Sequence, residues 1–218
     1  MNPDEFSSHI LFEDEDLIVI NKPLGVPSQE DLTGDPSILR SYEQVYSRTG
    51  YLVNRIDRPV SGCLVLAKSV HSYNELIQKK ITKKYIAIIH DQIPQREGRL
   101  THFIRRNGKK KKAAVRETQK EGFKVCSLEY ETIMNFERYQ GILVIPLTGR
   151  FHQIRAQLSF IGHPIKGDVK YGARRSNKGR AIDLHAHSID IPGKVQIDFA
   201  SSKREDNLWL EIEKKYGQ

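Results

Sequence analysis

The chain has 218 residues, of which 38% are hydrophobic and 28% are charged, a balance that allows a sizeable core and excludes wholesale disorder. Lys and Arg number 35 against 27 Asp and Glu, a net charge of +8, which suits a polyanionic partner but also occurs in ordinary basic enzymes. Neither a signal peptide at Met1–Ser8 nor an apolar run near the roughly 20 residues of a membrane span is visible.

The first half of the chain alternates strand and helix signals. Apolar blocks at 10–12 and 17–20 flank the acidic segment 13–16, which predicts a hairpin. Segment 21–27 then breaks regular structure with two prolines and a glycine. Asp35-Pro36 predicts the start of a helix that runs to about Arg48. Short strands are expected at 51–53 and 63–68, followed by a helix from Ser69 to about Lys80.

The second half continues the mixed pattern. Strands are expected at 85–89, 124–134, 141–147, 182–189 and 195–199, with an Asn107-Gly108 turn inside a basic run. Helical spacing from Phe151 ends at Gly162, and a terminal helix is expected at 207–216. Two distant cysteines, Cys63 and Cys126, give neither a disulfide framework nor metal spacing and indicate a reducing cytoplasm. The order of elements favours a mixed α/β or α+β sheet protein.

Asp57 is the first candidate for chemistry. It lies between Arg55 and Arg58 in a loop that continues into Pro59-Val60-Ser61-Gly62. Neighbouring cations favour an ionised carboxylate, which can attack an electrophilic carbon. Taken alone, the loop is more typical of a surface salt bridge in a polar turn than of a nucleophile.

Two further positions become candidate site residues when they are considered together with Asp57. Arg155 lies at the edge of the apolar stripe Phe151, Ile154, Leu158 and Ile161, where a guanidinium either pairs with a buried carboxylate such as Asp57 or reaches for water. Tyr85 follows Lys83-Lys84 at the start of a strand. Such a Tyr can stack on a base, although its usual place is with the ring in a core.

These segments, in this order, resemble the RluA-type pseudouridine synthases. The resemblance rests on 17–25, Arg55-Ile56-Asp57-Arg58-Pro59-Val60-Ser61-Gly62, Lys84-Tyr85, Gly149-Arg150-Phe151-His152-Gln153-Ile154-Arg155, 162–168 and Leu184-His185-Ala186, and it covers roughly 11–199. It implies an α+β fold with a mostly antiparallel mixed sheet of two joined lobes flanked by helices and loops, around a central active-site cleft.

The resemblance implies the isomerisation of specific uridines in ribosomal or transfer RNA, with Asp57 as nucleophile. Tyr85 would stack on the uracil and assist proton removal from carbon 5, and Arg155 would pair with Asp57. Arg55 would fill the space left by the flipped uridine, a flip that costs a few kcal/mol. Further substrate contacts are expected from Asn54, Arg58, Arg150, His152 and Gln153. No cofactor or metal is expected, in agreement with the lack of metal-ligand spacing.

Two positions depart from the family pattern. Asn54 stands where the family usually has His, and Val60 where it has Thr, which bears on loop geometry and substrate choice. Residues 1–218 are expected to form a single catalytic domain, without the S4-like N-terminal RNA-binding domain that many relatives carry. We also expect a monomer, with no membrane association.

Several features keep alternatives open. Arg105, Arg106, Lys109, Lys110, Lys111 and Lys112, with Arg116, form either an RNA-binding hairpin or a solvated basic loop, and the basic segment 174–180 is equally ambiguous. His185 and His187 share one strand face, where packing or hydrogen bonding is favoured over a metal. A catalytically silent RNA-binding protein on the same fold is the alternative function, and a small-molecule hydrolase using Asp57 ranks last because it lacks a base and a metal.

Overall fold

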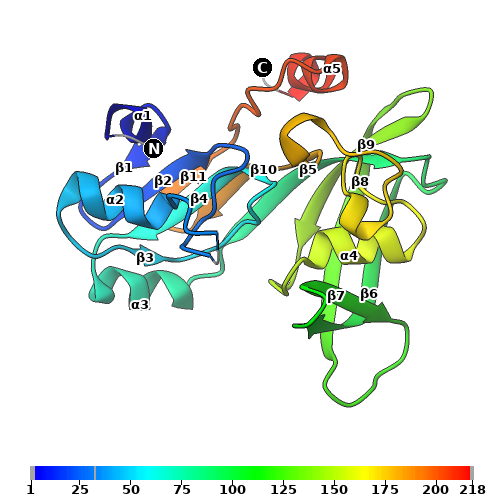
Figure 1. The fold of residues 1–218 in the computed structure, drawn as a ribbon, viewed down its shortest axis with the longest axis horizontal. Coiled ribbons are helices and arrows are strands. Elements are labelled where there is room, and N and C mark those ends of the chain that lie inside the picture. Colours follow the sequence, from blue (N-terminus) through cyan, green and yellow to red (C-terminus); the bar gives the residue numbers. More distant parts are fainter. Residues whose placement is uncertain (1–2, 32, 217–218) are drawn as a thin grey trace. The chain divides into compact units, whose positions relative to one another are not determined.

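The computed structural model describes residues 3–31 and 33–216 of the chain. These residues have the α+β composition predicted from the sequence, with mostly antiparallel strand pairs and few helices (Figure 1). They divide into two compact units. Unit 1 comprises the chain up to Lys83, His185–Trp209 and the part from Glu213 onward, and unit 2 comprises Lys84–Leu184 and Leu210–Ile212.

Unit 1 is built on the strand order β1-β2-β4-β10, with β3 beside β4 and β11 beside β10. Its elements are α1 (Pro3–Ser7), β1 (Ile10–Glu13), β2 (Leu17–Lys22), α2 (Ile38–Tyr46), β3 (Tyr51–Leu52), β4 (Ser61–Ala67), α3 (Val70–Gln78), β10 (Leu184–Ile191) and β11 (Val195–Ile197). Every residue of β2 and β4 is buried. Both strands therefore have continuous apolar runs rather than the alternation of a half-exposed sheet.

Strand β4 starts immediately after the Asp57 loop, and its first residues fix where that loop ends. Ser61 and Gly62 pair in parallel with His185 and Ala186 of β10. Gly62 has a φ of +111°, and a Cβ atom there would lie 2.2 Å from the carbonyl oxygen of Ala186. Only glycine satisfies both conditions, so the close approach of β4 and β10 depends on this residue.

Unit 2 is built on the antiparallel strand order β5-β9-β8-β6-β7. Its elements are β5 (Thr82–His90), β6 (Glu97–Asn107), β7 (Lys112–Arg116), β8 (Lys124–Asn135), β9 (Tyr139–Pro146), α4 (Gln153–Phe160) and the 3₁₀ helices η1 (Val169–Tyr171) and η2 (Lys178–Arg180). Helix α5 (Asn207–Tyr216) is the last described element.

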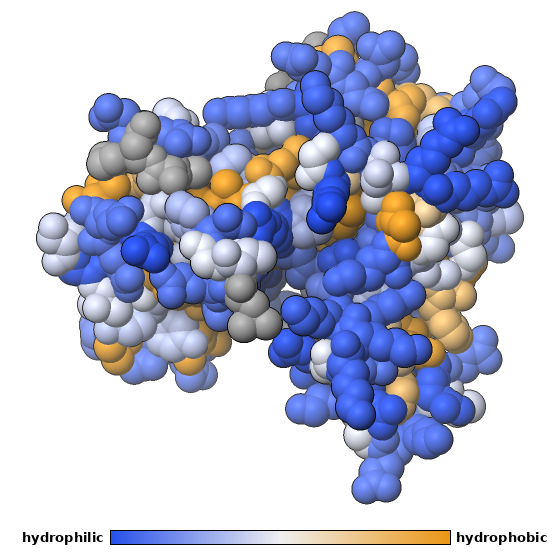
Figure 2. Space-filling view, in the orientation of Figure 1, coloured by the Kyte–Doolittle hydropathy of each residue, from blue (hydrophilic) through white to orange (hydrophobic). Residues whose placement is uncertain are grey.

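Helix α4 packs on the β6–β7 hairpin through a small hydrophobic core. Its buried members are Ile104, Ala113, Cys126, Ala156 and Tyr171, with Val115 and Phe151 packed against them. The hairpin tip beyond this core, 107–111, is mostly exposed and carries three lysines. Figure 2 shows this end of unit 2 covered mainly by hydrophilic residues.

Most elements predicted from the sequence are present, but several differ from the prediction. Helix α2 starts at Ile38 with Ser37 as its N-cap, not at Asp35-Pro36. Helix α4 starts at Gln153, so Phe151 precedes it. Helix α1 and most of strand β6 were not predicted, although the Asn107-Gly108 turn was.

Two properties of the described residues bear on other functions. None of their helices is long and apolar enough to cross a membrane. Within the same residues, no group of three or more His, Cys, Asp or Glu side chains is arranged to hold a metal ion.

Candidate active site

The Asp57 loop of unit 1 is anchored by side chains on both sides of the aspartate. The Ser28 hydroxyl donates to the Ile56 carbonyl at 2.8 Å and accepts the Ile56 N–H at 3.3 Å. Asn54 is 9% exposed and bridges to β4, because its amide donates to the Cys63 carbonyl and accepts the Val65 N–H. A substrate contact of Asn54 stays a prediction, since the observed bonds of its amide hold the loop.

After Asp57 the loop is held by main-chain carbonyls. The Val60 N–H donates to the Asp57 carbonyl at 2.9 Å and closes a turn. The Arg58 carbonyl accepts the Gly25 N–H at 3.0 Å and the Lys22 Nζ at 3.4 Å. The peptide groups on both sides of Asp57 are therefore fixed, and the half-buried Asp57 lies between two anchored residues.

Lys22 is a fully buried lysine beside this loop. Its Nζ also donates to the carbonyls of Pro23 at 2.8 Å and Val26 at 2.7 Å. Burial lowers the pKa of Lys22 to about 7, an effect that the Asp57 carboxylate opposes and the Arg58 guanidinium reinforces. Lys22 thus links strand β2, the 23–26 turn and the Asp57 loop through one amine.

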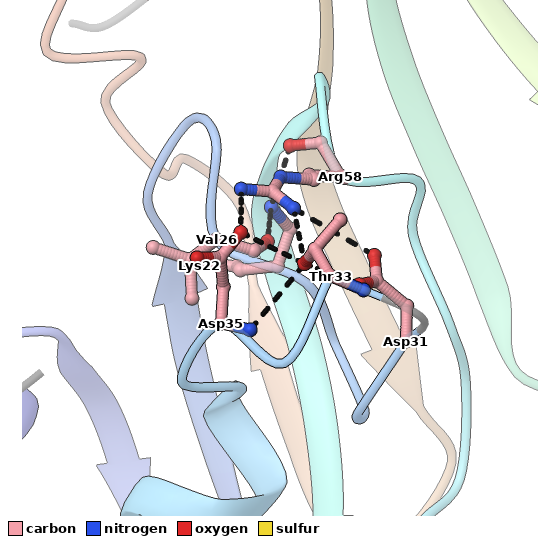
Figure 3. A network of polar contacts seen from close by, with 6 residues as sticks. All are labelled: Lys22, Val26, Asp31, Thr33, Asp35 and Arg58. Atoms are coloured by element: carbon pink, nitrogen blue, oxygen red, sulfur yellow. Dashed lines mark hydrogen bonds and ion pairs between the residues drawn. The ribbon is translucent and has the colours of Figure 1, made fainter.

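The Arg58 guanidinium contacts Asp31, Thr33 and Asp35 (Figure 3). Its Nη2 lies 2.5 Å from Asp35 Oδ2, and its Nη1 lies 2.9 Å from Thr33 Oγ1 and 3.8 Å from Asp31 Oδ2. Hydrogen bonds from Thr33 and then from Arg58 hold the pKa of Asp35 below its usual range. The sequence places Arg58 beside Asp57, but its side chain pairs with these two other carboxylates.

Arg55 differs from its neighbours in the loop. Its side chain is exposed and has no hydrogen-bond or ion-pair partner among the described residues. A long cationic side chain in this state is available to contact a bound polyanion.

His185 of β10 supports the end of the same loop. Its Nε2 lies 2.6 Å from the Ala200 carbonyl and must donate to it, so Nδ1 accepts the Ser61 hydroxyl at 2.9 Å. Burial lowers the pKa of His185 to about 3, which keeps the ring neutral. The expected hydrogen-bonding role is therefore observed for His185, while His187 packs against Phe199.

In unit 2, Tyr85 lies on β5 opposite Val144 of β9 and is 8% exposed. Its predicted stacking on a uracil ring stays a prediction. The preceding Lys84 is exposed, whereas Lys83 is partly buried, and this burial lowers its pKa.

The segment before helix α4 is organised by Gln153. This 4% exposed side chain donates to the Ser127 carbonyl at 3.0 Å and accepts from the Thr148 hydroxyl and the Arg150 N–H. The exposed Arg150 side chain donates to the Val125 carbonyl at 3.2 Å. Gln153 thus ties the helix start to β8, and the substrate contacts expected of Gln153 and Arg150 stay predictions.

His152 adopts a left-handed conformation at the N-cap of α4, with φ +53°. Its ring stacks on Phe151 with centroids 3.8 Å apart, and its Nδ1 lies 2.9 Å from the Tyr171 hydroxyl. The same hydroxyl accepts the Ala113 N–H of β7 at 2.7 Å. These contacts fix the N-terminal turn of α4 against the hairpin.

Arg155 is buried, at 5% exposure, and is not the water-seeking arginine that the sequence left open. Its Nε lies 2.6 Å from Asp168 Oδ2 and its Nη2 lies 2.9 Å from Asp168 Oδ1, a bidentate ion pair with a carboxylate that is 1% exposed. The guanidinium also lies 5.0 Å from the Tyr171 ring centroid. The pairing of Arg155 with Asp57 stays a prediction, because the two residues belong to different units.

The basic hairpin, residues 105–116, presents cations on both faces of its strands. Arg105 lies 4.8 Å from the Phe123 ring centroid, and Arg106 lies 4.6 Å from that of Phe151. Lys112 lies 4.8 Å from the Tyr171 ring, whereas Lys109, Lys110 and Lys111 are exposed at the tip. Stacking of this kind pre-orients guanidinium groups without removing them from solvent.

Sequence reasoning missed Lys22, Ser28 and Asp168 as site residues. Lys22 and Asp168 lie in segments that carried the family resemblance, so their position was the available signal. Nothing in the local sequence around Ser28 indicates its two bonds to Ile56, because they join residues 28 positions apart.

Comparison with known proteins gives a consistent result. Residues 16–160 match a family model described as RNA pseudouridylate synthase. The chain is 35% identical over 194 residues to an uncharacterised RNA pseudouridine synthase of Bacillus subtilis, covering 84% of this chain and 66% of the relative. It is 30% identical over 209 residues to ribosomal large subunit pseudouridine synthase D of Borreliella burgdorferi, covering 88% and 63%. The chain thus spans slightly less than two thirds of these relatives' own lengths.

Solved structures show the same fold. Human RNA pseudouridylate synthase domain containing 1 superposes with a TM-score of 0.74 at 24% identity, covering 86% of this chain and 81% of that one. Human RNA pseudouridylate synthase domain containing 4 also gives a TM-score of 0.74, at 21% identity, covering 99% and 95%.

Proposed function

Since this chain belongs to the RNA pseudouridylate synthase family, we propose that it isomerises specific uridines in RNA to pseudouridine, with Asp57 as the nucleophile. The observation that carries the proposal is the extent of the family match, which spans Asp57, Tyr85 and Arg155 within residues 16–160. The anchored Asp57 loop supports it, because a nucleophile must be held in a productive geometry.

The reaction conserves every carbon, nitrogen and oxygen atom of the base. The bond between the ribose and nitrogen 1 breaks, a bond between the ribose and carbon 5 forms, carbon 5 loses a proton and nitrogen 1 gains one. Asp57 would form the transient covalent bond, Tyr85 would stack on the uracil and assist the proton transfer, and Arg155 would hold the Asp57 carboxylate. In this proposal the two units act together as one catalytic domain.

The exposed Arg55 would occupy the position that the flipped uridine leaves, which offsets part of the few kcal/mol that flipping costs. Asn54, Arg150, His152 and Gln153 would shape the substrate site around the reacting residues. The basic hairpin would bind phosphates outside it through Arg105, Arg106 and Lys109–Lys112. No metal or cofactor enters the proposal.

We propose ribosomal RNA as the first substrate to test, because relatives are named for the large ribosomal subunit. Transfer RNA is the second, and a cytoplasmic monomer is the proposed form of the protein. Pseudouridine maps of total RNA from cells with and without this protein would identify the RNA and the uridine.

The direct test uses RNA transcribed with uridine carrying tritium at carbon 5, since the isomerisation releases that label into water. We expect the wild-type protein to release tritium, and Asp57→Asn to bind the same RNA with no release. Asp190→Asn is the matched control, because Asp190 is an exposed carboxylate in the same unit. Undiminished release by Asp57→Asn would exclude Asp57 as the nucleophile. RNA binding by the wild type with no release from any RNA would favour the catalytically silent alternative.

A further inference from the structure

The surroundings of Arg58 show how its side chain is used. Of the two arginines that flank Asp57, Arg55 is exposed, whereas Arg58 bonds to Asp35 and Thr33 and lies 3.8 Å from Asp31 (Figure 3). Asp31, Thr33 and Asp35 lie more than 20 residues earlier in the chain. Thr33 links the two carboxylates, because its hydroxyl donates to Asp31 or Asp35 and its N–H donates to Asp31. Two carboxylates around one guanidinium give this cluster a net negative charge.

A net negative cluster is a poor site for an RNA phosphate. A phosphate that approached Arg58 would meet a guanidinium that already donates to Asp35 and Thr33, and it would face the negative charges of Asp35 and Asp31. Phosphate binding by proteins usually uses arginines and lysines whose donors remain available. The observed contacts therefore favour a role for Arg58 within the loop over the substrate contact that was expected from the sequence.

The same contacts fix Arg58 at both of its ends. Its guanidinium is held by the Asp35 carboxylate, and its carbonyl accepts from Gly25 and Lys22. Arg58 follows Asp57 directly, so a shift of the Arg58 main chain would be transmitted to Asp57. Displacement of a catalytic group by about 1 Å can cost about a hundredfold in rate.

We propose that Arg58 is a positioning residue for Asp57, and that Asp31, Thr33 and Asp35 form a latch that holds the nucleophile loop through it. The proposal rests on the proposed function, because it assigns a role within that reaction. The latch removes Arg58 from RNA recognition and leaves that task to Arg55 and the basic hairpin.

The test compares Arg58→Gln and Asp35→Asn with the control Asp190→Asn, using a transcript of large-subunit ribosomal RNA or whichever RNA the wild type modifies. The single-turnover rate at saturating RNA and the Kd at several salt concentrations are measured for each protein, well below its melting temperature. The latch predicts a rate about 10- to 100-fold lower for Arg58→Gln and a smaller loss for Asp35→Asn. The double variant should be no slower than Arg58→Gln, because both changes break one interaction.

The RNA affinity separates the latch from a direct phosphate contact. The latch predicts that Asp35→Asn leaves the Kd and its salt dependence unchanged. If Arg58 instead binds a phosphate, Asp35→Asn should tighten RNA binding, and Arg58→Gln should flatten the slope of log K against log salt by about 0.7 to 0.9. That result, or unchanged rates in both variants of an active enzyme, would overturn the proposal. A wild-type protein without activity on any RNA would refute the proposed function instead.

Discussion

Replacing Asp168 by Asn should destabilise the protein far more than its small change in shape suggests. The carboxylate is 1% exposed and makes bonds of 2.6 and 2.9 Å to Arg155, which is itself 5% exposed. Asn retains one acceptor but turns an N–H₂ group toward the other donor, and it removes the negative charge that pairs with the guanidinium at these two bonds. Breaking one side of a buried ion pair costs about 3 to 5 kcal/mol.

This loss can be measured by urea denaturation or by melting. For a chain of this size, about 3 to 5 kcal/mol corresponds to a drop in Tm of roughly 6 to 20 °C. The control is Asp91→Asn in the same unit, because Asp91 is exposed and its φ of +59° suits Asn. A loss below about 1 kcal/mol for Asp168→Asn would refute the account of a buried, charge-compensated pair.

A second variant separates stability from chemistry. Arg155→Met combined with Asp168→Leu replaces the buried pair by apolar side chains, an exchange that is often neutral or stabilising. We expect this double variant to recover most of the lost unfolding free energy but no tritium release from labelled RNA. If it regained activity together with stability, Arg155 would have a structural role only.

Two further predictions concern protonation and RNA binding. The pKa of His185 is about 3 in the folded protein against 6.5 ordinarily, so between these values the unfolded chain binds a proton that the folded protein does not. The unfolding free energy should therefore fall as the pH is lowered from about 6.5, and this group should account for a loss of about 2 kcal/mol at pH 5. If the unfolding free energy of wild type and of His185→Gln fell equally steeply with pH, this account would be contradicted. Replacing the exposed Lys109, Lys110 and Lys111 by Ser should reduce the salt dependence of RNA binding. The slope of log K against log salt concentration should become shallower by about 0.7 to 0.9 for each lysine that contacts a phosphate. An unchanged slope would show that the tip is a solvated loop.

The elements that the sequence predicted well are those with local signals. Ser69 caps α3 as expected, because its hydroxyl accepts the Ser72 N–H three residues later. The β1–β2 hairpin and the buried strands β2 and β4 follow from apolar runs bounded by turn residues. The family resemblance then supplied Asp57, Tyr85 and Arg155 as candidates, which no single segment would have done.

What the sequence missed depends on contacts between distant residues. Asp35 was expected to start a helix, but its carboxylate bonds to Arg58, 23 positions away, and Ser37 caps α2 instead. The ion pair of Arg155 with the buried Asp168, which lies beyond the turn after α4, was also not predicted. Strand β6 was not predicted because many of its residues are exposed and several are charged, so its sequence shows little alternation between apolar and polar residues.

Some residues of the Asp57 loop are anchored and one is not, and this difference affects how the target of the protein could change during evolution. Asn54, Ile56 and Arg58 are each tied to other segments by hydrogen bonds, so substitutions at these positions or at their partners disturb the loop itself. Arg55 lies between them with an exposed side chain. Variation at this one position would alter what the loop presents to the proposed RNA substrate without altering the scaffold, which makes position 55 the natural place to begin redesigning the target of this protein.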